Sequence, residues 1–217
     1  MEKKFWTDSW DEGGFKTSFH KLDVHRYILK HLTPGRLKNK RVLVPLCGKS
    51  VDLMYFKKYA AQVIGIEFIE EAVKQFFQEQ QLPYSKAGNT YYSENLTLIN
   101  TDFFTVTKEQ VGHIDLIYDR ACLVALPLNL RYKYLEKVDE LLPMGSKQFV
   151  NTLQYAPTRP EPPFSIPPEE VKKYYGHSHT IEHLEWDTIP NHGLQRVWGL
   201  DYVKEHGFLL TKNKLPN

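Results

Sequence analysis

Apolar positions fall into two patterns along the chain. Short apolar runs, which predict buried strands, cover residues 41–46, 62–66, 96–99, 114–118, 147–153, 179–186 and 202–211. Apolar stripes at helical spacing, which predict helices packed on a sheet, cover residues 19–32, 50–60, 69–77, 130–141 and 169–175. The polar stretch 84–93 is expected to be irregular. Strands that alternate with helices predict a doubly wound, mostly parallel α/β sheet of seven strands.

The length of 217 residues suits one domain covering 1–217. We expect it to contain an N-terminal aromatic lid and helix (1–33), a cofactor-binding core (41–155), and a substrate-side loop with closing strands (156–217). The loop is rich in proline, so it is expected to form a stiff wall at the carboxyl end of the fifth strand.

The stretch Arg41–Glu67 organises this expectation. A strand runs into a turn at Cys47-Gly48-Lys49, a helix follows, and a second strand ends on Glu67. Ligands of doubly wound sheets bind beyond the carboxyl ends of the strands, where an acid about 20 residues after the glycine turn holds ribose hydroxyls. Glu67 is the candidate ribose ligand.

The turn itself discriminates between nucleotide ligands. A dinucleotide site requires G-x-G-x-x-G, and only Gly48 is present here. A P-loop requires a glycine where this chain has Leu43. S-adenosyl-L-methionine has an adenosine but no phosphate, so a tight turn and a ribose acid suffice, and it is the leading candidate. An ordinary strand–helix–strand unit that ends by chance on an acid is the alternative.

Two further strand ends carry candidate ligands. Asp102 and Phe103 follow the third strand, where they could bind an adenine amine and ring, or could instead cap a helix and fill the core. Arg120 follows the fourth strand and is expected in the same cleft as Leu46 and Glu67. A surface contact between Asp119 and Arg120 is the alternative.

The N-terminal segment is densely aromatic, and it could plug the core edge or close over a sulfonium by cation–π attraction; it contains Phe5, Trp6, Trp10, Phe15 and Phe19. Three histidines, His177, His179 and His183, lie close together in sequence, but no cysteine or acid accompanies them at zinc spacing. We therefore expect no metal.

Composition adds exclusions. Lysine plus arginine (28) nearly balances aspartate plus glutamate (26), without a basic stripe for nucleic acid or a membrane surface. Two cysteines make no disulfide framework, and no signal peptide or membrane-spanning run is evident. A cytoplasmic, monomeric protein that binds small molecules is expected.

Several motifs together resemble the thiopurine S-methyltransferase family, in particular its bacterial members. They are W-x-x-x-W with a following F-H (Trp6, Trp10, Phe19-His20), P-L-C-G-K-S (45–50), V-I-G-I-E (63–67), Y-D-R-A with A-L-P (118–127), and P-P-F-S-I-P (162–167). The resemblance covers nearly the whole chain. It implies a class I S-adenosylmethionine-dependent methyltransferase fold with a reversed last strand, and methyl transfer to the sulfur of aromatic or heterocyclic thiols. Some bacterial relatives are linked to selenium or tellurium detoxification.

The resemblance also implies roles for individual residues. Cofactor contacts would come from Trp10, Leu46, Gly48, Glu67, Asp102, Phe103 and Arg120. Phe19, Arg120 and Arg196 would face the acceptor, with Arg120 as the catalytic residue. Mammalian members have an arginine just before a late tryptophan. Here Arg196 is not at the matching position relative to Trp198, so the acceptor pocket departs from the family pattern. A small-thiol or halide methyltransferase and a non-catalytic S-adenosylmethionine-binding protein are the competing hypotheses.

Overall fold

The computed structural model describes residues 7, 8, 10, 12, 21–120 and 122–213 of the chain. The chain divides into two compact units, one that ends at Asp115 and one that begins at Leu116. The organisation of 1–217 as one domain therefore stays a prediction.

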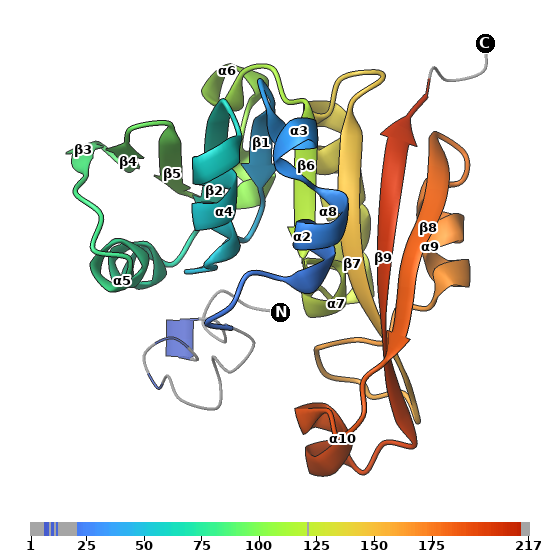
Figure 1. Cartoon of the computed structure of the whole chain (residues 1–217). Coiled ribbons are helices and arrows are strands. Elements are labelled where there is room, and N and C mark those ends of the chain that lie inside the picture. Colours follow the sequence, from blue (N-terminus) through green and yellow to red (C-terminus); the bar gives the residue numbers. More distant parts are fainter. Residues whose placement is uncertain (1–6, 9, 11, 13–20, 121, 214–217) are drawn as a thin grey trace. The chain divides into compact units, whose positions relative to one another are not determined.

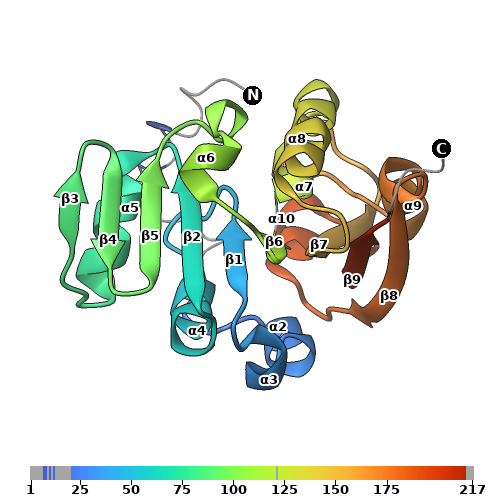
Figure 2. The ribbon, with the colours of Figure 1, turned by 90° about the horizontal axis from the view of Figure 1, so that it is seen from above.

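The first unit contains a sheet with the strand order β3-β4-β5-β2-β1 (Figures 1 and 2). Strands β1 (Arg41–Val44), β2 (Gln62–Glu67) and β5 (Leu96–Asn100) run parallel. Strands β4 (Thr90–Ser93) and β3 (Ser85–Ala87) continue the sheet in antiparallel pairing. Since β1, β2 and β5 are parallel, their carboxyl ends meet at one edge.

The helices of this unit are mostly short; they are α2 (Arg26–His31), α3 (Pro34–Leu37), α4 (Asp52–Tyr59), α5 (Glu70–Glu79), η2 (Phe103–Thr105) and α6 (Lys108–Val111). Helix α5 is the clearest product of its sequence pattern. Its buried residues Ala72, Val73, Phe76 and Phe77 recur at helical spacing. Glu70 and Glu71 occupy its first turn, where they complement the helix dipole.

The expectation that residues 84–93 are irregular is wrong, because β3 and β4 form a hairpin there. Tyr91 is only 1 % exposed and stacks on Phe77 of α5 at a ring distance of 5.9 Å. Its hydroxyl donates to Glu70 at 2.6 Å, and Lys86 donates to the same carboxylate at 2.7 Å. Contacts with α5 thus stabilise strands that are too short to show an alternating pattern. Strands β3 and β4 are the two that the prediction of seven strands lacked.

The second unit contains a sheet with the order β6-β7-β9-β8. Strands β6 (Leu116–Arg120) and β7 (Lys147–Ala156) are parallel. Strand β9 (Tyr202–Lys212) is antiparallel to both β7 and β8 (His179–Thr188), which confirms the reversed last strand and the pairing of the two closing strands. Their connection contains helix α10 (Gly193–Trp198), which lies beyond the end of the β8–β9 pair in Figure 1.

A buried arginine joins the helices of the second unit, α7 (Cys122–Ala125), α8 (Leu128–Leu141) and α9 (Pro168–Tyr175). Arg131 on α8 is 5 % exposed. Its Nη1 donates to Glu170 at 2.6 Å and to the Tyr174 hydroxyl at 2.7 Å, both on α9. Nε and Nη2 donate to the carbonyl of Leu126, the residue that directly follows α7.

The N-terminal helix differs from the prediction over 19–32. Helix α2 begins at Arg26, because the His25 side chain accepts from the Tyr27 amide and caps it. Helix α2 ends at His31, with Leu32 as its C-cap, close to the predicted end. Pro34 then begins helix α3, since proline is compatible with a first helical turn. Among the described residues, no helix combines the length and apolarity needed to cross a bilayer.

Candidate functional site

The turn after β1 has an unusual backbone. Leu46 has φ +47° and Gly48 has φ +51°, both in the left-handed region. For a residue with the bulk of leucine this conformation is unfavourable and is typical of a functional turn. The Cys47 amide donates to the Ile66 carbonyl at 3.0 Å, which holds the turn against the end of β2.

Glu67 is the last residue of β2 and is 5 % exposed. Its Oε2 accepts from the Gly48 amide at 2.9 Å, and its Oε1 accepts from the Ile69 amide at 2.8 Å. Burial raises the pKa of this carboxyl to about 7, although the backbone hydrogen bonds oppose the rise. A carboxylate has about four acceptor positions, so capacity is left for a ribose hydroxyl. The residues at this edge therefore fit an adenosine cofactor.

Gly65 shows how closely the turn packs on β2. A Cβ at this position would lie 2.5 Å from Leu98 Cδ2 and 2.8 Å from Cys47 Sγ. Cys47 is buried, and its pKa is raised first by burial and then by the Glu67 charge. The Cys47 thiol is therefore a packing group and is not activated as a nucleophile.

Lys49 does not act as a P-loop lysine. Its Nζ donates to Glu79 Oε1 at 2.6 Å and to Gln75 Oε1 at 3.1 Å, both on α5. Ser50 Oγ accepts from the Asp52 amide at 3.3 Å just before α4, whose N-cap residue is Val51. The turn therefore has no free lysine for a phosphate, as expected from the missing glycine at Leu43.

Trp10 lies beside the segment that follows Glu67. It is 6 % exposed and packs with Phe68, Ile69 and Ala72. The structure thus brings Trp10, the Gly48 turn and the Glu67 segment together in the first unit, and their contact with the cofactor stays a prediction. Phe19 and most of the aromatic lid lie outside the described residues.

The end of β5 joins the same edge. Asn100 Nδ2 donates to the Glu67 carbonyl at 3.0 Å. Asp102 is exposed, and its Oδ1 accepts from the Phe104 amide at 3.0 Å, so it caps η2. Phe103 is 3 % exposed. The capping alternative is therefore confirmed, and the adenine role of Asp102 and Phe103 stays a prediction.

In the second unit, Arg120 is the last residue of β6 and is partly buried. The preceding Asp119 is completely buried; its Oδ2 accepts from the Tyr134 hydroxyl at 2.8 Å and its Oδ1 from the Cys122 amide at 3.1 Å. Burial raises the pKa of Asp119 to about 6. Asp119 thus bonds to the start of α7 and, because it is buried, makes no surface pair. The approach of Arg120 to Leu46 and Glu67, which belong to the other unit, stays a prediction.

A residue that sequence reasoning missed is Arg159, in the proline-rich loop. Its guanidinium carbon lies 5.9 Å from the centre of the Trp198 ring, and its Nη2 donates to the Trp198 carbonyl at 3.1 Å. Arg196 is exposed and its Nη1 donates to the Asn191 carbonyl. The arginine beside Trp198 therefore comes from a distant part of the sequence, which no local motif signals.

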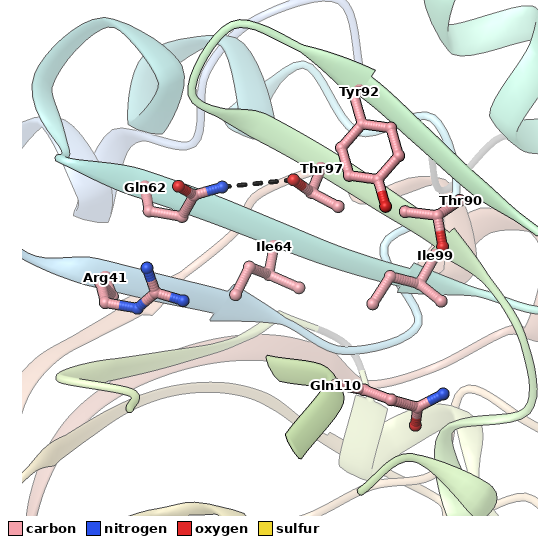
Figure 3. A pocket seen from close by; sticks show the side chains of 8 residues that line it. All are labelled: Arg41, Gln62, Ile64, Thr90, Tyr92, Thr97, Ile99 and Gln110. Carbon is pink, nitrogen blue, oxygen red and sulfur yellow. Dashed lines mark hydrogen bonds between the residues drawn. The ribbon is translucent and has the colours of Figure 1, made fainter. Parts of the chain in front are cut away.

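Figure 3 shows a pocket of about 340 Å³ on one face of the first unit's sheet. Ile64 and Ile99 form part of its apolar lining, and Gln62 donates to Thr97 across it. Arg41 also lines it, but its guanidinium donates to the carbonyls of residues 111 and 113. None of the candidate cofactor residues lines this pocket.

The described residues contain no group of three or more His, Cys, Asp or Glu side chains that could hold a metal ion. His177 precedes β8, whereas His179 and His183 lie on it. The absence of a metal stays a prediction.

Solved structures of methyltransferases share this fold. An S-adenosylmethionine-dependent methyltransferase from Anabaena variabilis matches with a TM-score of 0.64 and 12% identity, over 97% of this chain and 94% of that one. A second match is the 1,6-didemethyltoxoflavin-N1-methyltransferase of Burkholderia thailandensis, solved with S-adenosylhomocysteine. Its TM-score is 0.61 and its identity 13%, over 97% of this chain and 87% of that one. The fold is that of the class I S-adenosylmethionine-dependent methyltransferases.

Sequence relatives narrow the class. Thiopurine S-methyltransferase of Legionella pneumophila (strain Paris) is 38% identical over 83% of this chain and 84% of its own length. The thiopurine S-methyltransferase of Pseudomonas aeruginosa (strain UCBPP-PA14) is 35% identical over 98% of this chain and 100% of its own length. The thiopurine S-methyltransferase family matches residues 1–213. The chain belongs to this family and is an enzyme that uses S-adenosyl-L-methionine.

Proposed function

We propose that this methyltransferase transfers the methyl group of S-adenosyl-L-methionine to the sulfur of aromatic or heteroaromatic thiols. The names of its relatives support this acceptor class, because thiopurines are heteroaromatic thiols. The structural observation that carries the proposal is the group formed by Arg159, Trp198 and Tyr155 in the second unit.

This group combines flat apolar surface with positive charge. Tyr155 and Trp198 meet edge to face at a ring distance of 5.8 Å, and Arg159 lies over Trp198. Within the described residues, Arg159 Nε is buried and has no hydrogen-bond partner. A planar thiolate would gain stacking from the rings and charge stabilisation from the guanidinium.

The position of the group fits an acceptor site. In the parallel pair β6–β7, Arg120 is registered opposite Asn151, so both side chains leave the same face of the sheet. Tyr155 is on that face of β7 as well, further toward its carboxyl end. We therefore assign Arg120 and Arg159 to the acceptor anion. Arg196 is the competing candidate for the second arginine.

The cofactor supplies a methyl group already activated by its sulfonium centre. The chain's own residues then need to align the acceptor, which can contribute several kcal/mol, and to exclude water. In our proposal Leu46, Gly48 and Glu67 hold the adenosine with Asp102 and Phe103 near its base, while Trp10 and Phe19 close over the reacting groups. A heteroaromatic thiol ionises readily, so an arginine that favours its thiolate removes the need for a strong general base. No residue is assigned as an indispensable proton carrier.

The test is a steady-state comparison of acceptors with the full chain. The panel contains an aromatic thiol, a heteroaromatic thiol, a small aliphatic thiol, iodide, selenite and tellurite. We expect kcat/KM to be largest for the first two. A preference for the aliphatic thiol or iodide would instead indicate a small-thiol or halide methyltransferase. Tight S-adenosylhomocysteine binding without turnover on any acceptor would indicate a non-catalytic binding protein. Turnover of the two oxyanions would extend the function to selenium or tellurium.

Matched variants locate the acceptor arginines. Arg120→Ala and Arg159→Ala are expected to lower kcat/KM for a heteroaromatic thiol by about 10–100-fold, as lost charge-assisted contacts do. Arg196→Ala, an exposed arginine on α10, serves as the control and should change it by less than about twofold. Unchanged activity in Arg120→Ala would refute its catalytic role. A larger loss in Arg196→Ala than in Arg159→Ala would reverse the assignment of the second arginine.

A further inference from the structure

A completely buried carboxylate directly precedes Arg120 in the second unit. Asp119 and Arg120 are the last two residues of β6. Since successive side chains of a strand leave opposite faces of a sheet, Asp119 points away from the face on which we place the acceptor. Burial of an ionised group is costly unless hydrogen-bond donors surround it, so this carboxylate depends on its partners.

The donors to Asp119 come from three neighbouring elements. Its Oδ2 accepts from the Tyr134 hydroxyl on α8 at 2.8 Å and from Gln148 Nε2 on β7 at 3.4 Å. Its Oδ1 accepts from the amide of Cys122, the first residue of α7, at 3.1 Å. Burial and then the Asp119 charge raise the pKa of Tyr134, so the hydroxyl stays protonated and donates. The Tyr134 bond is therefore the shorter of the two that hold Oδ2.

The orientation of Gln148 follows from the same carboxylate. Its Nε2 also donates to the Tyr175 hydroxyl on α9 at 3.1 Å. Its Oε1 is buried and has no hydrogen-bond partner among the described residues. The reverse orientation would place this oxygen against Asp119 Oδ2, where two acceptors repel. The amide thus leaves one of its own atoms unpaired and donates to the carboxylate.

These bonds hold the backbone on both sides of Arg120. The bond from the Cys122 amide to Asp119 closes a short loop of chain that contains Arg120. In the β6–β7 pairing Arg120 lies opposite Asn151, whose Nδ2 donates to the His206 carbonyl on β9 at 3.1 Å. Arg120 therefore starts from a backbone that is fixed by a paired strand before it and by a closed loop after it.

We propose that Tyr134 is a positioning residue for methyl transfer, which acts through Asp119 to hold Arg120 where its guanidinium meets the acceptor thiolate. The inference rests on the acceptor role proposed for Arg120. Tyr134 reaches Asp119 from the face opposite to Arg120, so it acts without touching the acceptor. Such an effect can be large, because a misplacement of about 1 Å can lower a rate by about 100-fold.

The test removes a single hydroxyl from the full chain. Tyr134→Phe should lower kcat/KM for a heteroaromatic thiol at saturating S-adenosyl-L-methionine by about tenfold, as the loss of one hydrogen bond to a charged group does. Tyr174→Phe is the matched control, since it removes a buried hydroxyl that also bonds charged groups in this unit, Arg131 and Glu170. Its kcat/KM should change by less than about twofold, because Tyr174 does not bond to Asp119. Urea unfolding verifies that each variant folds.

A double-mutant cycle separates positioning from packing. Arg120→Ala has no guanidinium to place, so adding Tyr134→Phe to it should lower kcat/KM by less than about a further twofold. Gln148→Met removes the longer bond to Asp119 and provides a second perturbation if Tyr134→Phe folds poorly. It should lower kcat/KM by less than Tyr134→Phe does, and again only when Arg120 is present.

The outcomes distinguish this inference from the proposed function. A tenfold loss from Tyr134→Phe in both backgrounds, or an equal loss in Tyr174→Phe, would overturn the positioning role and indicate a general effect of packing. A loss in Arg120→Ala without any loss in Tyr134→Phe or Gln148→Met would overturn this inference alone. Full activity in Arg120→Ala would refute the acceptor role of Arg120, and the positioning role with it.

Discussion

Glu67→Gln tests the cofactor site most directly. In the wild type, two backbone amides donate to the Glu67 carboxylate at 2.8 and 2.9 Å. Glutamine keeps the shape but has one acceptor oxygen, so its NH₂ group would face the Gly48 or the Ile69 amide. A buried donor left unsatisfied costs about 1–3 kcal/mol. Since our proposal places Gly48 in the turn that holds the cofactor, affinity for S-adenosylhomocysteine at pH 8 should fall by about 10–100-fold.

The pH dependence gives an independent signature. Burial raises the pKa of Glu67 from 4.5 to about 7, so the carboxyl is ionised at pH 8 and protonated at pH 6. A ribose hydroxyl donates to the ionised form, so wild-type affinity should fall as the pH drops below 7, by up to about tenfold per pH unit. The variant has no titrating group here, so its affinity should be flat.

Folding stability should respond with the opposite sign. Between pH 4.5 and 7 the folded state holds a proton on Glu67 that the unfolded state has lost, so the free energy of unfolding decreases as pH rises through this window. A shift of that size corresponds to about 3 kcal/mol in total. Urea unfolding of wild type and Glu67→Gln from pH 4.5 to 8 measures the difference, and calorimetry measures the affinity. Parallel pH profiles in both assays, or equal affinities at pH 8, would refute the assignment of Glu67.

The remaining predictions concern packing and buried charge. Asp119→Asn should lower the free energy of unfolding by about 1–3 kcal/mol at pH 8, because asparagine offers one oxygen where the Tyr134 hydroxyl and a backbone amide both donate. A urea unfolding midpoint equal to that of wild type would contradict this. Gly65→Ala should lower the free energy of unfolding by about 1–3 kcal/mol through overpacking against Leu98. A double-mutant cycle with Leu98→Ala should show that the two losses are coupled. Additive losses would show that the clash is relieved elsewhere. Arg131→Met should lower the free energy of unfolding by about 2–4 kcal/mol, because it removes the cation paired with the Glu170 carboxylate and the donor to the Leu126 carbonyl. Thermal unfolding at neutral pH measures the change, and a loss below about 1 kcal/mol would show that the helices of the second unit do not depend on this ion pair.

The sequence alone determined the parallel strands, the larger helices and the meeting of the Gly48 turn with Glu67 at the carboxyl edge of the strands. These rest on local signals: apolar runs for β1, β2 and β5, the helical stripe of α5, and a glycine turn followed at a set distance by an acid. Because the carboxyl ends of parallel strands share an edge, the meeting of Gly48 with Glu67 follows from the strand pattern, and their hydrogen bond confirms it.

Only the tertiary structure decided which distant side chains meet. The β3–β4 hairpin exists because Tyr91 packs on Phe77, a contact between elements whose own patterns are too short or too polar to indicate it. The arginine beside Trp198 comes from position 159, and His183 faces His206 across two strands rather than its sequence neighbours. Such contacts depend on strand register and loop path. These are set by the packing of the whole unit and leave no periodic signal in the sequence.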